Sequence, residues 1–112
     1  MDTKVNQLTG NTIPKKNFLV RRRRYKDGKT TLIIGTHFIE VDLFADVIWL
    51  MIDGKLRISD IAEKIAYKEH LEPAYAYIVS YITIYHFHNY DLVELSDLAC
   101  VSQTVMKTTL AD

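Results

Sequence analysis

Cysteine, glycine and proline are scarce in this sequence, which has one, four and two of them among 112 residues. A lone cysteine, Cys100, excludes an intrachain disulfide and is typical of a reducing compartment. With so few glycines there is no glycine-rich loop of the kind that cradles a phosphate group. No apolar run reaches the roughly 18 residues of a membrane span, and the polar N-terminus lacks the apolar segment of a signal peptide. The sequence therefore predicts a cytoplasmic protein that does not enter a membrane.

An excess of charge of one sign is also missing. Fourteen Lys and Arg residues balance fourteen Asp and Glu residues, so the formal net charge is zero. A neutral chain has no global attraction to a polyanion, which disfavours nucleic acid as a partner. A hydrophobic fraction of 48% is enough for a core, and the length is typical of one domain.

Signals for catalysis or metal binding are weak. His86 and His88 are two residues apart on a predicted helix, so they point about 200° apart and cannot share a metal ion. His37 and His70 belong to other elements, and no cluster of cysteines or carboxylates has ligand spacing. Cys100 has no histidine that the sequence places nearby as a base. We therefore expect a protein that is not an enzyme and that carries no metal or cofactor.

The stretch 41–66 predicts two short helices joined by a tight turn. Asp42 is a typical N-cap of the first helix, and Ser59 of the second, because short polar side chains accept the free N–H groups of a first turn. Asp53-Gly54 is expected to end the first helix, since glycine adopts the left-handed backbone that such ends require. Both helices carry an apolar stripe, so they must be buried against each other and against something more.

Residues 18–41 predict three short strands in a meander. Asp27-Gly28 favours a hairpin with a type I′ turn, and Gly35 separates the next pair of strands. Phe38 and Ile39 are neighbours, and neighbouring side chains of a strand point to opposite faces. The sheet is therefore covered on both faces or offers one face to a partner.

The segment 73–89 predicts a helix that begins at Pro73 and is apolar or aromatic almost all round. Two interpretations stay open. The helix is a central core helix, or one stripe meets the core while the other lines a groove for a partner, where tyrosine is a favoured residue. The first stripe contains Tyr77, Ile84 and Phe87, and the second contains Ile78, Tyr81, Ile82 and Tyr85.

The run Arg21–Arg24 is the strongest charge feature. On a strand, alternate arginines face opposite sides. The run is then a solvated edge strand that discourages random sheet pairing, a contact for an acidic peptide, or a contact for nucleic acid. The sequence alone leaves these three interpretations open.

A known motif runs through the central stretch. The pattern resembles that of the PqqD-like family, the peptide recognition elements of ribosomally synthesised and post-translationally modified peptides (RiPPs). The likeness covers about residues 18–95, and at Asp91 this chain departs from the glycine usual in the family. The residues that carry it are Val41-Asp42, Ala45, Ile48-Trp49, Met51 to Lys55, Ile58, Asp60-Ile61, Ile65-Ala66 and Leu92 to Leu95.

The resemblance implies an α+β, winged-helix-like fold, with a three-stranded antiparallel sheet followed by three helices. It implies a peptide-recognition domain at 18–95, and the flanks have no counterpart in the motif. Residues 1–16 are polar, with Gly10 and Pro14 as breakers, so 1–17 is expected to be a flexible or loosely docked N-terminal arm. Residues 96–112 are expected to be a C-terminal tail or extra helix. If the tail folds back over the peptide site, its deletion should raise affinity for the peptide. Ile48, Trp49, Ile61 and Ile65 are expected in the core.

The resemblance also implies a function. The chain would bind the leader segment of a precursor peptide as an added strand on its third strand, beside its third helix, and present it to a modifying enzyme. The expected strand edge is His37, Phe38, Ile39, Glu40 and Val41. The expected pocket is Ile78, Tyr81, Ile82 and Tyr85, with His88 at its rim.

The modifying enzyme stays open between a radical-SAM protein, a cyclodehydratase, a lanthipeptide dehydratase and a lasso-type protease. One alternative function is a winged-helix DNA-binding regulator, which predicts basic residues on the recognition helix. Residues 73–90 contain no lysine or arginine, which disfavours it. Another alternative is a small dimerisation module that buries the apolar helix between two copies, so a homodimer also stays open.

Overall fold

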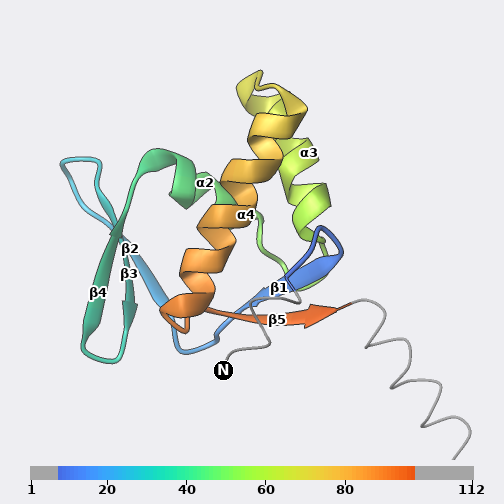
Figure 1. Cartoon of the computed structure of the whole chain (residues 1–112). Coiled ribbons are helices and arrows are strands. Elements are labelled where there is room, and N and C mark those ends of the chain that lie inside the picture. Colours follow the sequence, from blue (N-terminus) through green and yellow to red (C-terminus); the bar gives the residue numbers. More distant parts are fainter. Residues whose placement is uncertain (1–7, 98–112) are drawn as a thin grey trace, which may run out of the picture.

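The computed structural model describes residues 8–97 of the chain. In chain order its elements are β1 (Thr12–Lys16), β2 (Arg21–Arg24), β3 (Thr30–Ile34), β4 (His37–Val41), α2 (Leu43–Met51), α3 (Ile58–Glu69), α4 (Pro73–Asn89) and β5 (Val93–Asp97). In Figure 1, α4 lies between the three-stranded sheet and α3, and the two-stranded sheet crosses below the C-terminal end of α4. The predicted α+β fold, with a three-stranded antiparallel sheet and three helices, is confirmed.

The three-stranded sheet has the order β2-β3-β4, and both pairs are antiparallel. Leu32 on β3 is fully buried and lies opposite Ile39 on β4, which packs against the core. Phe38, the neighbour of Ile39, has 66% of its surface exposed. One face of the sheet therefore meets the helices and the other faces away from the core, as the alternation of side chains requires.

The first hairpin differs from the predicted type I′ turn. Within its loop only Gly28 has a positive φ, of 90°, whereas a type I′ turn needs a positive φ at both central residues. The Tyr25 N–H donates to the Lys29 carbonyl at 2.8 Å, and the Asp27 carboxylate accepts the Lys29 N–H at 3.0 Å. The loop is thus longer than two residues and is closed partly by a side chain.

The second sheet was not predicted. β1 pairs with β5 in antiparallel register, from Thr12 opposite Asp97 to Lys16 opposite Val93. Residues 8–16 were assigned to an arm, yet Leu8 and Pro14 are buried within the fold. Pro14 argued against a strand, but proline is tolerated where a strand has a free edge. Residues 1–7 of the expected arm and 98–112 of the expected tail lie outside the described residues.

The helix ends follow local chemistry, with one correction. Asp42 caps α2 as predicted, since its carboxylate accepts the Ala45 N–H at 2.7 Å. Ser59 was expected to cap α3, but α3 begins at Ile58 after Arg57. Asp60 reaches back there: its carboxylate accepts the Arg57 N–H at 3.0 Å, and the guanidinium as well. A first-turn aspartate therefore takes the role assigned to the serine.

The predicted core is present. Ile48, Ile61 and Ile65 are fully buried, and Trp49 is nearly so. The ring of Trp49 meets the ring of Phe87 on α4 edge to face, with centroids 5.5 Å apart, an arrangement favoured between aromatic side chains. α4 is therefore fixed by the core along one side, which both interpretations of its sequence require.

The backbone at Asp91, where this chain departs from the family motif, has a conformation that favours glycine. Asp91 takes a positive φ of 61° just after α4, a conformation that glycine adopts freely and that aspartate tolerates better than most residues. Its carbonyl accepts the side-chain amide of Asn17 at 2.9 Å, which joins the end of α4 to the chain after β1.

Candidate functional site

β4 is an open edge of the three-stranded sheet. Among residues 8–97 it pairs with β3 alone. His37 lies opposite Ile34 across the two-residue turn, so these two residues form the hydrogen-bonded pair that closes the hairpin. Hydrogen-bonded and non-hydrogen-bonded pairs then alternate along an antiparallel ladder. The backbone N–H and C=O groups of Phe38 and Glu40 accordingly point to the open side.

The side chains of the predicted edge divide between two faces. Ile39 packs against the core and Val41 is buried in it, while Phe38 and Glu40 stand on the opposite face and are exposed. His37 is exposed at the hairpin end of the strand. Of the five predicted edge residues, three therefore have exposed side chains, while Ile39 and Val41 are held by the core.

The predicted stripe on α4 is split by the structure. Ile78 and Ile82 are one turn apart and are 53% and 48% exposed. Tyr85 is half-buried against the core. Tyr81 points elsewhere: its hydroxyl donates to the Leu8 carbonyl at 3.0 Å. The hydroxyl of Tyr81 thus has a partner within the chain, and contact of Tyr81 with a peptide stays a prediction.

His88 shares the side of Tyr81. It follows Tyr81 by two helical turns, so the two side chains lie on one side of α4. It is half-buried, and within residues 8–97 its Nδ1 atom is buried without a hydrogen-bond partner. Only Ile78 and Ile82 of the α4 residues assigned to the pocket and its rim are therefore largely exposed.

An apolar cavity opens elsewhere, at the C-terminal end of β4. Its volume is about 420 Å³, and most of the residues that line it belong to α2. α2 begins only two residues after β4 ends. The sequence did not predict this cavity, because its wall combines side chains of α2 and α3. One local signal was present: two apolar residues directly follow a strand and a helix cap. Its lining residues are Leu43, Phe44, Val47, Ile65 and Glu69.

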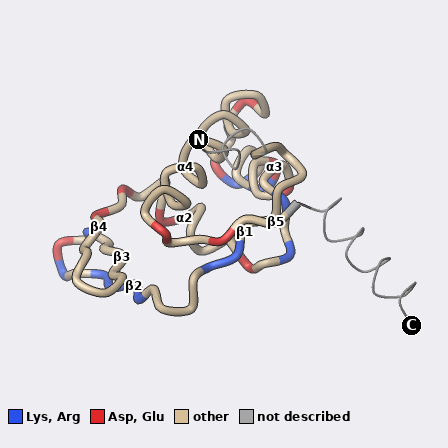
Figure 2. The backbone as a smooth tube through the Cα atoms, turned by 60° about the horizontal axis from the view of Figure 1, so that its bottom comes forward, with Lys and Arg blue, Asp and Glu red and all other residues tan. Residues whose placement is uncertain are grey.

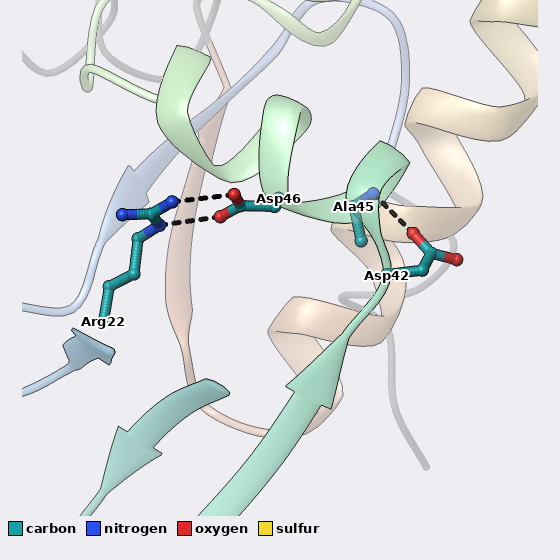
Figure 3. A network of polar contacts seen from close by, with 4 residues as sticks. All are labelled: Arg22, Asp42, Ala45 and Asp46. Atoms are coloured by element: carbon teal, nitrogen blue, oxygen red, sulfur yellow. Dashed lines mark hydrogen bonds and ion pairs between the residues drawn. The ribbon is translucent and has the colours of Figure 1, made fainter. Parts of the chain in front are cut away.

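A bidentate ion pair joins β2 of the sheet to α2, the helix that supplies most of the cavity lining. Arg22 Nε and Nη2 donate to the two carboxylate oxygens of Asp46 at 2.7 and 2.8 Å (Figure 3). Asp46 is only 3% exposed. The guanidinium hydrogen bond lowers the pKa of Asp46 below its ordinary value, although desolvation opposes it. The sequence indicated that alternate arginines diverge, but not that one of them meets a carboxylate 24 residues away.

The remaining arginines lie on the other edge of the sheet. β2 is the strand farthest from β4, with β3 between them. Neighbouring strands lie about 4.8 Å apart, so the arginine strand is about 10 Å from the open side of β4. The idea that these arginines meet a peptide bound at β4 has no support in this geometry.

Residues 8–97 lack two further kinds of feature. No group of three or more histidine, cysteine or acidic residues between 8 and 97 is placed to hold a metal ion. Across the same residues, every helix is too short or too polar to cross a lipid bilayer.

Comparisons with known proteins point to one fold. No family model matches the sequence, and no curated protein matches it. The structure is similar to the solution NMR structure of the PqqD truncation of Methylobacterium extorquens PqqCD, described as a functional and stand-alone RiPP recognition element. The TM-score is 0.69 at 19% sequence identity, and the match covers 78% of this chain and 94% of that one. The chain therefore has a PqqD-like fold.

Proposed function

We propose that this chain, which shares the fold of a RiPP recognition element, binds the leader segment of a precursor peptide and presents it to a modifying enzyme. The observation that carries the proposal is the unpaired edge of β4 on that fold. The chain acts as a binding module with no catalytic residue of its own.

Strand addition on β4 provides affinity without reading the leader sequence. The open N–H and C=O groups of Phe38 and Glu40 offer a backbone ladder to an extended peptide. Alternate side chains of the added strand then fall on the two faces of the sheet. One set turns toward the helices, and the other lies beside Phe38 and Glu40.

Apolar contacts at the helices provide specificity. A strand that continues past Val41 runs toward Leu43 and Phe44, where the cavity is large enough for one or two apolar side chains. Ile78 and Ile82 present exposed apolar surface on α4. The leader is therefore expected to carry apolar residues on the face that turns toward the helices.

The two alternative functions have less support. A DNA-binding regulator needs basic residues on the helix that enters the groove, whereas the exposed face of α4 carries isoleucines. A dimerisation module would need α4 for its core, yet Ala76, Ile84 and Phe87 are already buried within the chain.

Proline substitution at β4 tests strand addition. Glu40→Pro removes an N–H that points to the open side, so the sheet keeps its own hydrogen bonds and leader affinity falls about tenfold. The matched variant Ile39→Pro removes an N–H that bonds to β3 and should lower the thermal unfolding midpoint instead. The probe is a fluorescein-labelled leader from the precursor encoded nearest to this gene, followed by anisotropy.

A second measurement does not depend on how the variant folds. Leader peptides N-methylated at alternate residues are titrated against the unaltered protein. Strand addition requires that methylation at one parity abolishes binding while the other parity is tolerated. Equal tolerance of both series would exclude strand addition.

A further inference from the structure

The outward face of the three-stranded sheet carries a basic and apolar surface that a leader bound at the β4 edge would adjoin at Phe38. The register places Arg21, Ile33 and Phe38 in one row across β2, β3 and β4. Arg23 stands beside them on the same face, two residues along β2 from Arg21. Residues of one row on one face contact each other across strands. We call Arg21, Arg23, Ile33 and Phe38 the outward patch.

The arginines of the outward patch are exposed, and within residues 8–97 neither pairs with a carboxylate. The ion pairs of residues 8–97 join Arg22 to Asp46, Lys29 to Glu40 and Arg57 to Asp60. Arg21 and Arg23 take part in none of these pairs, and Arg23 only stacks on the ring of Tyr25, 5.3 Å from its centroid. Their charge is therefore available to an external anion.

Positive charge gathers at this edge although the whole chain is neutral. Figure 2 shows lysine and arginine along β2 and on the chain near β1, while acidic residues lie on the helices, at the start of α2 and also close to β4. The apolar part of the patch is exposed too: Phe38 is largely solvent-accessible and Ile33 is half-exposed. Arginine beside an aromatic residue is the composition typical of the energetic centre of a protein interface.

We propose that the outward patch docks a carboxylate-rich protein surface with an apolar contact at its centre, and that this surface belongs to the modifying enzyme. The assignment to that enzyme rests on the proposed function. The outward patch lies on the face of the sheet that points away from α4. Its arginines lie on β2, the edge strand opposite β4. One sheet can thus hold the leader on one edge and the enzyme on its outward face.

A protein partner fits this patch better than nucleic acid. A strand of four residues spans only about 13 Å, which is shorter than a half-turn of DNA. Arg22 is already held by Asp46, so it is not free to contact a phosphate group. Ile33 and Phe38, the apolar part of the patch, have no partner in a phosphate backbone.

The test uses the full chain and a defined acidic probe. The ¹⁵N-labelled protein is titrated with poly-L-glutamate and with the random copolymer poly-L-(glutamate, tyrosine). Amide shifts should concentrate on residues 21–24, 31–33 and 38, and the copolymer should bind more tightly. Arg21→Glu with Arg23→Glu should weaken binding about tenfold or more. The matched pair Lys64→Glu with Lys68→Glu makes the same charge change on exposed positions of α3 and should leave affinity unchanged.

Three outcomes would overturn the proposal. Equal losses in the two charge-reversed pairs would mean that only net charge matters. Shifts centred on α3 or on the cavity would place the anion elsewhere. Tighter binding of double-stranded DNA than of either acidic polymer would make the patch a nucleic-acid contact.

Leader titration separates this proposal from the proposed function. The Arg21→Glu and Arg23→Glu variant should bind leader with the affinity of the unaltered protein, because its arginines lie on the other edge. If no leader binds at all while the acidic polymers still map to the outward patch, then the proposed function fails and the docking surface stands. If leader binds and the polymers do not, the docking surface fails alone.

Discussion

Asp46 is the residue at which burial and charge conflict most. A buried carboxylate is unfavourable unless a cation pairs with it, and removal of one partner leaves the other unsatisfied. Arg22 supplies two hydrogen bonds in a parallel fork, the strongest geometry that an arginine offers. The pair therefore holds β2 against α2 and fixes how the sheet meets the helices.

This pair predicts a specific pH dependence. The pKa of Asp46 is lowered in the folded state from an ordinary value of 3.8. The stabilisation of the fold by the ionised Asp46 carboxylate is therefore complete above about pH 5 and is lost as the pH falls through the lowered pKa. Asp46→Asn should reduce the free energy of unfolding by about 2 kcal/mol near neutral pH, and the difference from the unaltered protein should shrink in acid.

Urea unfolding followed by tryptophan fluorescence at neutral and acidic pH measures this difference. The exposed carboxylate of Glu63 on α3 gives the control, since Glu63→Gln should change stability little at either pH. A constant deficit of Asp46→Asn across the whole pH range would show that the carboxylate stabilises the fold by packing and not by its charge.

The cavity gives a prediction with an internal control. Leu43 and Leu50 both lie on α2 and are 73% and 54% exposed, but only Leu43 lines the cavity. Leu43→Ser should weaken leader binding about fivefold, because about 1 kcal/mol of apolar contact is lost. Leu50→Ser should bind normally. Equal affinities of the two variants, measured by calorimetric titration, would remove the cavity from the binding site.

At the scale of elements, local signals identified most of the fold. The bounds of α4 follow from Pro73 and from the length of the apolar segment, and the Asp42 cap follows from its own chemistry. β1 was missed because its sequence is polar and contains Pro14, and because its partner β5 is about 80 residues away. Pairing over that distance leaves no local signature in a single sequence.

The same limit explains the outcome for the predicted pocket. The sequence shows that α4 carries two apolar stripes, but which segments cover each residue depends on distant parts of the chain. Leu8 reaches Tyr81 across 73 residues of sequence. Ile78 and Ile82 stay exposed because no described segment crosses them. The open edge of β4, by contrast, follows from the order of a local meander and was predictable.

The contact of Tyr81 predicts a division between stability and binding. Tyr81→Phe removes the hydrogen bond to the Leu8 carbonyl and should lower the free energy of unfolding by about 1 kcal/mol. Leader affinity should stay unchanged, since this side of α4 is already covered. Thermal unfolding and anisotropy on the same sample check both. Normal stability with reduced affinity would return Tyr81 to the peptide site.

At the scale of the whole molecule, residues 8–16 are part of the fold. Leu8 and Pro14 are buried, and β1 supplies one strand of the second sheet. A protein that starts at residue 17 should lose at least about 3 kcal/mol of stability through these buried side chains alone. A protein that starts at residue 8 keeps every described contact and serves as the control. Both are compared by circular dichroism during heating, and equal midpoints would show that β1 is dispensable.

The pairing of β1 with β5 places the first and last strands of the described fold side by side. Thr12 and Asp97 face each other across the ladder, so their Cα atoms are about 5 Å apart. This unit could therefore be inserted into a surface loop of another protein without forcing the two sides of that loop apart. The same closeness lets a short glycine linker join the two ends, with a new start opened in the Gly28 hairpin.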